Sequence, residues 1–222
     1  MQKEFLITED GSHTIYLPGM DEYYHSTHGA IQEALHIYIE QGLLQSSLPE
    51  ISILEIGFGT GLNAYLTFCY AQNLNIKINY YSLEKYPLSE DEYQKLNYSD
   101  IIFPEFSSVF ALMHQSQWDL PVMISPDFKL QKLQADLTCY DFKVLPKFNL
   151  IYYDAFAPSK QPEMWTDDIL QRVSDSVIKG GILVTYCAKG SVRRSFSAAG
   201  FEMERIPGPI GKKEILRGKK KF

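Results

Sequence analysis

The sequence has few of the features that mark secreted, membrane or metal-dependent proteins. Its three cysteines (Cys69, Cys139 and Cys187) lie far apart and form no CxxC pair, so neither a disulfide framework nor a thiolate metal site is expected. No apolar run approaches the ~18 residues of a membrane-spanning helix. The charged start, Met-Gln-Lys-Glu-Phe, is not followed by the apolar stretch of a signal peptide. We therefore expect a reduced, cytoplasmic protein without a membrane segment or a metal.

Internal repeats and low-complexity linkers are also missing, and 222 residues suit a single domain. The net charge of −6 argues at first against a nucleic-acid partner, but the charge is uneven. Residues 189–222 hold ten Lys or Arg against three acids, a net +7, so the remaining 188 residues carry −13. An acidic body with one basic edge suits an anionic partner. A solvated basic tail explains the same asymmetry, and charge alone slightly favours that explanation.

Strand and helix patterns alternate along most of the chain. Residues 5–17 predict a β-hairpin turning at Asp10-Gly11, and a helix is expected over residues 30–44. Expected strands then cover residues 51–56, 76–83, 128–133, 148–153 and 182–187. Expected helices cover residues 62–70, a segment opened by a Ser89/Glu92 capping box, a broken stretch over 100–118, 166–178 and 191–199. Residues 201–206 and 214–220 close as a strand pair. We predict one α/β domain over 1–222, with an extension over 1–48 and a core over 49–222, whose mostly parallel sheet ends in an antiparallel C-terminal strand.

Glycines follow the first core strand in the pattern Glu55-x-Gly57-x-Gly59-x-Gly61-x-Asn63. The dinucleotide fingerprint GxGxxG fails, because its third glycine would fall at Leu62. ExGxGxG is instead the first motif of class I S-adenosylmethionine-dependent methyltransferases with a Rossmann-like fold. We expect this loop to pack on the cofactor, S-adenosyl-L-methionine, since glycines allow close backbone approach. A glycine-rich turn without a ligand is the alternative.

Acidic residues follow the next two strands, at the edge where ligands bind in such sheets. Glu84 can accept hydrogen bonds from both ribose hydroxyls, and Asp136 from the adenine amino group. Each has an alternative role, as a solvated loop glutamate and as a turn-capping aspartate.

After the fourth strand come Asp154 and Phe156, and then Trp165. Methyltransferases hold the methyl acceptor here, and Asp154 can orient an amine and accept its proton. Core packing is the alternative for both aromatics, at even odds for Trp165. Tyr24 can line the site from the extension or only pack. His25, His28 and His36 form no convincing metal set.

Taken together, these motifs resemble the methyltransferase domain of the MnmC family and its stand-alone form, MnmD, which act on tRNA. The resemblance covers nearly the whole chain. It rests on segments 21–24, 58–63, 82–88, 154–158, 162–165, 192–194, 199–201, 207–208 and 211–216. It departs at Ala155, Gln161 and Ala135, which puts fine loop geometry in doubt. It also adds Lys85 to the cofactor site.

The resemblance implies an activity and its partners. The enzyme would methylate the amine of 5-aminomethyl-(2-thio)uridine at wobble position 34, in the anticodon loop of tRNA. Tyr24, Phe156 and Trp165 would stack on the base, while Arg193, Arg194, Lys212 and Lys213 would hold phosphates. MnmC also carries an FAD domain, for which these residues have no counterpart, so a separate enzyme would supply the aminomethyl group. A small-molecule N- or O-methyltransferase, a non-catalytic adaptor and, more distantly, an aminopropyltransferase remain alternatives.

Overall fold

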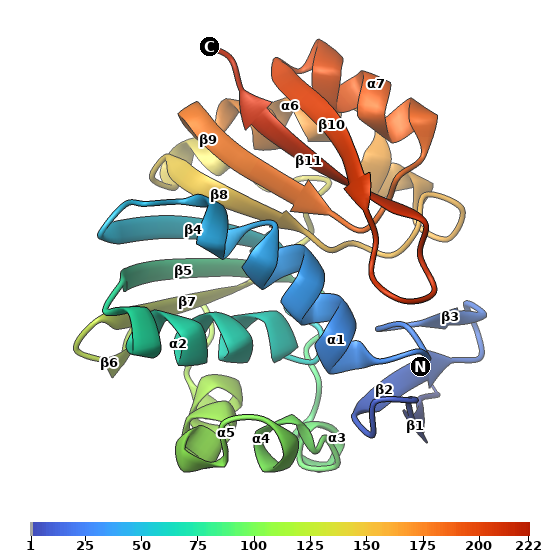
Figure 1. Ribbon diagram of the computed structural model, residues 1–222, viewed down its shortest axis with the longest axis vertical. Coiled ribbons are helices and arrows are strands. Elements are labelled where there is room, and N and C mark those ends of the chain that lie inside the picture. Colours follow the sequence, from blue (N-terminus) through green and yellow to red (C-terminus); the bar gives the residue numbers. More distant parts are fainter. Residues whose placement is uncertain (1) are drawn as a thin grey trace.

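The computed structural model describes residues 2–222 and shows an eight-stranded sheet between two layers of helices (Figure 1). The strand order is β10-β11-β9-β8-β4-β5-β7-β6. The strands are β4 (Glu50–Ile56), β5 (Lys77–Glu84), β6 (Pro121–Ser125), β7 (Phe128–Gln134), β8 (Phe148–Tyr153), β9 (Val177–Thr185), β10 (Phe201–Pro207) and β11 (Glu214–Lys220). The five strands β9, β8, β4, β5 and β7 are parallel, and β6, β11 and β10 pair antiparallel. The mostly parallel sheet with an antiparallel C-terminal strand, predicted from the sequence, is confirmed.

Each face of the sheet is covered by helices over its own apolar core. One face carries α1 (Ala30–Ala34), the π-helical η1 (Leu35–Glu40) and α2 (Leu62–Leu74), and the opposite face carries α6 (Asp167–Asp175) and α7 (Gly190–Ala198) (Figure 1). Short helices extend the first layer: η2 (Leu43–Gln45), α3 (Glu90–Tyr93), α4 (Tyr98–Ile101), η3 (Pro104–Phe106) and α5 (Ser107–Gln115). The turns η4 (Phe142–Val144) and η5 (Pro162–Trp165) flank β8. Side chains alternate along the central strands, so both faces of each strand are buried.

The N-terminal segment forms a separate antiparallel sheet of β1 (Glu4–Ile7), β2 (His13–Leu17) and β3 (Glu22–Tyr23). The predicted hairpin is confirmed, and Gly11 has the positive φ of 83° that its turn requires. This small sheet lies beside the ends of β4 and β5 rather than joining the large sheet (Figure 1). It therefore stands next to the edge where a ligand is expected.

Three local predictions need correction. The helix predicted over 30–44 changes to π geometry at Leu35 and ends at Glu40. The helix predicted through Ile178 ends at Asp175, because Val177 and Ile178 already belong to strand β9, where Val177 pairs with Phe148 of β8. Strand β6 was missed, since it is a five-residue edge strand that opens with a proline and contains a bulge.

The local signals that set helix starts are confirmed. Ser89 and Glu92 form the capping box that opens α3. The Thr166 hydroxyl accepts from the backbone N–H of Ile169 at the start of α6, at 3.4 Å. These caps fix where the loops after β5 and β8 end, and so how much chain is left to border the site.

Candidate active site

A cavity of about 1150 Å³ opens where the parallel strands end. Its walls come from the loops after β4, β5, β7 and β8, from the N-terminal segment, and from the loop between β10 and β11. Of the residues predicted for the site, those on the cavity wall are Gly57, Gly59, Asn63, Glu84, Lys85, Asp136, Asp154, Tyr24, Phe156 and Lys212. Glu55, Gly61, Trp165, Arg193, Arg194 and Lys213 are outside it.

The glycine loop after β4 is tightly enclosed. Gly57 has φ 94°, and a Cβ there would lie 2.9 Å from the backbone oxygen of Asp154. Gly59 has φ 50°, and a Cβ there would lie 3.2 Å from the ring of Tyr24. Gly61 turns the chain into α2 and packs away from the cavity, where a Cβ would lie 2.7 Å from Nε2 of His114. A Cβ would be strained or crowded at each of these positions. The first two glycines line the cavity, where backbone without a side chain can approach a ligand closely.

Two histidines that the sequence did not single out for this role hold the middle of the loop. Nε2 of His25 lies 2.7 Å from Oγ1 of Thr60, and Nε2 of His114 lies 3.1 Å from the carbonyl oxygen of Thr60. Burial lowers the pKa of His25 to about 4 and that of His114 to about 3, so both rings are neutral at pH 7. His114 therefore donates from Nε2, because a carbonyl oxygen can only accept.

Glu84 is oriented by two backbone donors. Its Oε2 accepts from the N–H of Gly59 at 3.0 Å, and its Oε1 accepts from the N–H of Tyr86 at 2.7 Å. These bonds join the ends of β4 and β5 and hold the carboxylate on the cavity wall. A fixed carboxylate at this edge can accept from paired hydroxyl groups.

Asp136 is held by an ion pair at the end of β7. Lys85 Nζ lies 2.7 Å from its Oδ2, and the N–H and hydroxyl of Thr138 donate to its Oδ1. The Lys85 hydrogen bond is the main cause that lowers the pKa of Asp136 to about 2. Lys85 thus orients Asp136 as well as bordering the cavity.

Asp154 borders the cavity directly after β8. Asn63 Nδ2 donates to its Oδ2 at 2.8 Å, and its backbone N–H donates to the carbonyl oxygen of Ile56. Burial raises the pKa of Asp154 to about 7, against smaller lowering effects of Tyr38 and Asn63. A carboxylate with this pKa can take up a proton near neutral pH.

Glu55 departs from its predicted place. Its side chain is 0% exposed and is not on the cavity wall, so direct contact with the cofactor is corrected to a position beneath the site. It lies one residue before Ile56 on β4, and its Oε2 accepts from Oγ of Ser82 on β5 at 2.7 Å. The strand alternation turns this side chain into the layer of α2, under the loop that follows.

The aromatic residues divide between cavity and core. Tyr24 and Phe156 both line the cavity and meet edge to face, with ring centroids 5.1 Å apart. The ring centroids of Trp165 and Tyr153 lie 4.8 Å apart, and the Nε1–H of Trp165 donates to the carbonyl oxygen of Phe156 at 2.8 Å. The predicted base-stacking role of Trp165 is therefore corrected to supporting the Phe156 loop from behind.

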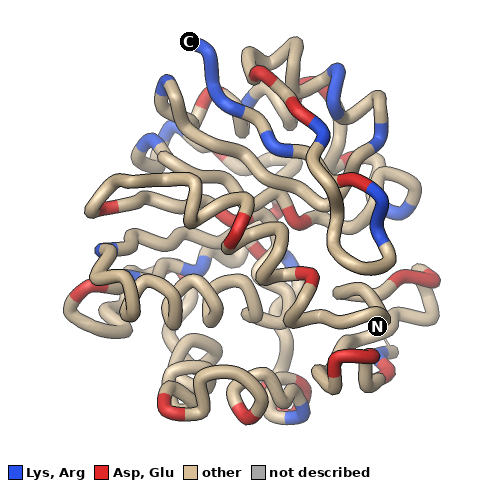
Figure 2. Tube along the Cα trace, in the orientation of Figure 1, with Lys and Arg blue, Asp and Glu red and all other residues tan. Residues whose placement is uncertain are grey.

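The basic residues are concentrated on the C-terminal elements, as Figure 2 shows for β10, β11 and α7. Arg193 and Arg194 on α7 are exposed, as is Lys213. Lys220 is instead buried and donates to Ser174 and Ala199, so it cannot hold a phosphate. Fewer basic side chains of residues 189–222 are therefore available to an anionic partner than the sequence suggests.

Lys212 is the member of this group that reaches the cavity. Its Nζ lies 3.2 Å from Oε1 of Glu33 on α1 and 4.9 Å from the ring centroid of Tyr186. Glu33 and Tyr186 also line the cavity, and the sequence did not single them out, because an acid on a helix and a tyrosine after a strand are common. The ion pair ties the extension to the loop between β10 and β11.

The chain is similar to known methyltransferases. A family model described as S-adenosyl-L-methionine-dependent methyltransferase matches residues 105–221. The chain belongs to this family. Its cofactor is therefore S-adenosyl-L-methionine, as predicted. A cavity lined by the glycine loop and by an oriented Glu84 fits such a nucleoside-bearing group.

The chain is also similar to proteins of the MnmC type. The bifunctional protein MnmC of Pseudomonas entomophila, named for tRNA 5-methylaminomethyl-2-thiouridine biosynthesis, is 32% identical over 218 residues, 89% of this chain and 32% of that protein. MnmC of Leptospira borgpetersenii is 33% identical over 213 residues, 90% of this chain and 32% of that protein. The chain spans about a third of the length of these relatives. The crystal structure of MnmC2 from Aquifex aeolicus matches with a TM-score of 0.81 and 27% identity, over 98% of this chain and 69% of that one.

Within residues 2–222, no group of three or more His, Cys, Asp or Glu side chains is arranged to hold a metal ion. No helix in the same range is long and apolar enough to cross a membrane.

Proposed function

We propose that this methyltransferase acts on the primary amine of 5-aminomethyl-(2-thio)uridine at wobble position 34 of tRNA, and forms the 5-methylaminomethyl nucleoside. The names of the relatives supply the substrate class, because the chain matches about a third of each of them at 32–33% identity. The observation that carries the proposal is Asp154, a carboxyl on the cavity wall with a pKa near 7. Such a group suits an acceptor that must lose a proton.

The cofactor side of the cavity is assigned first. We assign Gly57, Gly59 and Asn63 to the methionine and ribose portion, Glu84 to the ribose hydroxyls, and Asp136 with Lys85 to the adenine end. S-Adenosyl-L-methionine supplies an electrophilic methyl group when bound. Glu55 and Gly61 support this wall without reaching it.

Asp154 prepares the acceptor. An alkylammonium has no lone pair, so a proton must leave its nitrogen before the nitrogen can form a bond to carbon. Oδ2 of Asp154 is occupied by Asn63, which leaves Oδ1 for the amine. The proton passes to Oδ1, and the carboxyl then holds the neutral amine in line. Burial of the amine in the cavity lowers its own pKa and brings the two groups closer in proton affinity.

The wobble base must leave the anticodon loop to reach the cavity, where aromatic rings can stack on it, and the tRNA phosphates must be bound by basic side chains. We assign the platform to Tyr24 and Phe156, which are on the cavity wall. Lys212, Lys213, Arg193 and Arg194 are assigned to phosphates, so binding should weaken with salt. We also propose a separate enzyme that makes the aminomethyl group, and the cytoplasm as location, since tRNA is modified there.

The test uses purified protein, S-adenosyl-L-methionine and tRNA carrying 5-aminomethyluridine derivatives. After digestion, mass spectrometry should show a gain of one methyl group on the wobble nucleoside. A parallel reaction with tRNA whose wobble uridine carries no amine should show none. Methylation of free amines but not of tRNA would favour a small-molecule methyltransferase instead. Failure to bind S-adenosyl-L-methionine would favour an adaptor.

A further inference from the structure

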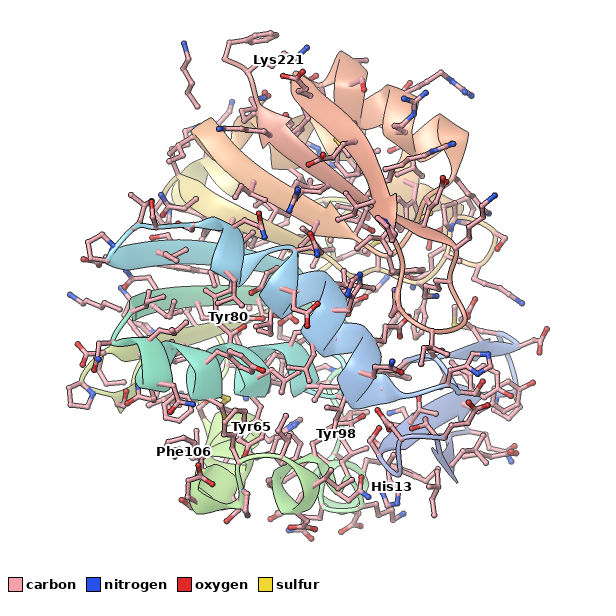
Figure 3. The ribbon with its side chains drawn as sticks, viewed as in Figure 1. His13, Tyr65, Tyr80, Tyr98, Phe106 and Lys221 are labelled. Atoms are coloured by element: carbon pink, nitrogen blue, oxygen red, sulfur yellow. The ribbon has the colours of Figure 1, made fainter. Side chains whose placement is uncertain are left out.

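Polar atoms without partners gather at one buried place. Within residues 2–222, five buried side-chain nitrogen or oxygen atoms have no hydrogen-bond partner. Four of them are Tyr38 Oη, Glu55 Oε1, Asn63 Oδ1 and Tyr80 Oη. Tyr80, labelled in Figure 3, lies between the sheet and the helices in front of it. Asn63 and Tyr80 act on Glu55, and Tyr38 and Asn63 act on Asp154, so the four atoms belong to one cluster around these two carboxyl groups. Unsatisfied buried groups are costly enough that such a cluster calls for a cause.

Glu55 has no cation to balance a negative charge. None of the ion pairs among residues 2–222 includes it. The titratable groups that act on it are Tyr80 on β5, Tyr152 on β8 and Asp154 after β8. Two of these are neutral phenols, and the third is another carboxyl. A buried carboxylate without a positive partner is strongly disfavoured.

One amide serves both carboxyl groups. Asn63 donates from Nδ2 to Oδ2 of Asp154 at 2.8 Å, and its side chain also acts on Glu55. The negative charge of Asp154 also acts on Glu55, and two buried carboxylates that act on each other are not both ionised at neutral pH, because like charges repel strongly in a buried site. Asp154 borders the cavity where a cation arrives, whereas Glu55 is sealed beneath it. The negative charge therefore belongs on Asp154 and the proton on Glu55.

We propose that Glu55 is a neutral carboxylic acid in the working enzyme and leaves the Asn63 N–H to Asp154, which makes Glu55 a positioning residue for the proton acceptor. Its own proton supplies a donor to a cluster that has an unpartnered acceptor in Asn63 Oδ1. The proton stays on Glu55 through the reaction, and only Asp154 exchanges one with the amine. This inference rests on the proposed role of Asp154.

The cluster has a consequence at alkaline pH. Burial raises the pKa of Glu55 to about 8, against the smaller lowering effect of the Ser82 hydrogen bond. Above that pH a charged Glu55 competes with Asp154 for the Asn63 amide. Turnover should then fall, although a higher pH also frees more neutral amine.

The first experiment needs no tRNA and no methylation. Infrared spectra of the wild-type protein at pH 7 should contain the carbonyl band of a buried, protonated carboxyl group. That band should vanish as the pH is raised through about 8. Asp154, whose pKa is about 7, adds a band of its own at pH 7, so the comparison is made in the Asp154→Asn background. There the remaining band should be missing when Glu55→Gln is added and unchanged when Glu50→Gln is added, which alters the exposed first residue of the same strand. A spectrum of Asp154→Asn without the band would overturn the proposal.

The second experiment measures the role. Glu55→Gln presents an amide where the neutral acid stood, so it should rescue most of the turnover that Glu55→Ala loses at pH 7, to within about threefold of wild type. It should also remove the alkaline fall in kcat and leave the KM for S-adenosyl-L-methionine unchanged. A rise of about tenfold or more in that KM would overturn the proposal, because it would show a charged Glu55 acting on the cofactor. If no tRNA is methylated at all, the infrared result and the calorimetric affinity for S-adenosyl-L-methionine still decide the state of Glu55.

Discussion

The two walls of the cavity are built in different ways. The cofactor wall consists of short loops after β4, β5 and β7, each directly following a parallel strand. The acceptor wall combines the N-terminal segment, the loop after β8 and the loop between β10 and β11, which meet through the ion pair of Glu33 and Lys212. Backbone geometry governs the first wall, whereas buried charges govern the second. Changes to the cofactor wall should therefore alter binding, and changes to the acceptor wall should alter turnover.

Replacing Asp154 should give the largest effect. Asp154→Ala removes the proposed proton acceptor, so kcat should fall about a thousandfold, within the range for general bases. The affinity for S-adenosyl-L-methionine, measured by calorimetry, should stay within about twofold, because no cofactor contact is lost. Asp154→Asn keeps the shape and should lose as much turnover. Loss of cofactor affinity together with turnover would show that Asp154 belongs to the other wall.

Adding a methyl group at Gly57 should test the wall that is assigned to the cofactor. Gly57→Ala places a Cβ 2.9 Å from the Asp154 backbone oxygen at a φ of 94°, so the loop must shift. We expect the affinity for S-adenosyl-L-methionine to fall about a hundredfold, from a strain of a few kcal/mol. The matched control is Gly180→Ala, which has a φ of 79° but open space around it and lies away from the cavity. Equal losses in both variants would mean that the Gly57 effect is backbone strain alone.

The oriented carboxylate of the cofactor wall should contribute less. Glu84→Gln keeps the side-chain shape but removes the charge that accepts from Gly59 and from the assigned ribose hydroxyls. We expect the dissociation constant of S-adenosyl-L-methionine to rise about tenfold or somewhat more, as for hydrogen bonds to a charged group. Isothermal calorimetry with the cofactor alone measures this. A change confined to kcat would contradict the division between the walls.

Protonation of Glu55 should also make the free energy of unfolding depend on pH. The pKa of Glu55 is about 8 in the fold, against 4.5 for the ordinary side chain, so between these values the folded protein keeps a proton that the unfolded chain has lost. Stability from this group is therefore lost as pH rises, by up to about 1.4 kcal/mol per pH unit. In denaturant unfolding from pH 5 to about pH 8, the free energy of unfolding of Glu55→Gln should rise relative to that of wild type, by up to this amount per pH unit. Parallel curves for the two proteins would mean that Glu55 is ionised in the fold.

The smallest effect should come from Lys213, which follows Lys212 in the chain but lies outside the cavity wall. It is exposed, whereas its neighbour Lys212 is paired with Glu33. Lys213→Ala should weaken tRNA binding only about two- to threefold and lower the salt dependence by about one phosphate contact. Lys212→Ala has the same net charge but should also lower kcat. Identical behaviour of the two variants would show that the ion pair with Glu33 does not shape the site.

Much of the cofactor wall could be predicted because its signals are local. Glycine spacing and an acid after a strand identified Gly57, Gly59, Glu84 and Asp136 as residues that the structure places on one cavity. The alternation of strands and helices likewise predicted the parallel sheet, apart from edge strand β6. Each of these features depends on a few adjacent residues, so the sequence carries it directly.

The rest depended on contacts between distant segments. Trp165 sits beside functional residues in sequence but faces the core, and Glu55 belongs to the motif but points beneath the loop. Glu33 and Tyr186 become visible only when the fold brings them beside Lys212. No spacing rule records these contacts, since they are set by strand alternation and by packing between the two ends of the chain.

The ion pair of Glu33 and Lys212 joins residues 179 positions apart, as their numbers show, and closes the acceptor wall. During synthesis the glycine loop and Glu84 leave the ribosome long before Lys212 does. A growing chain can therefore shape its cofactor loops early, but its acceptor pocket is complete only after almost all of these residues have emerged. Ordered assembly of this kind would keep unfinished chains from acting on their proposed substrate, the tRNAs that surround the ribosome making them.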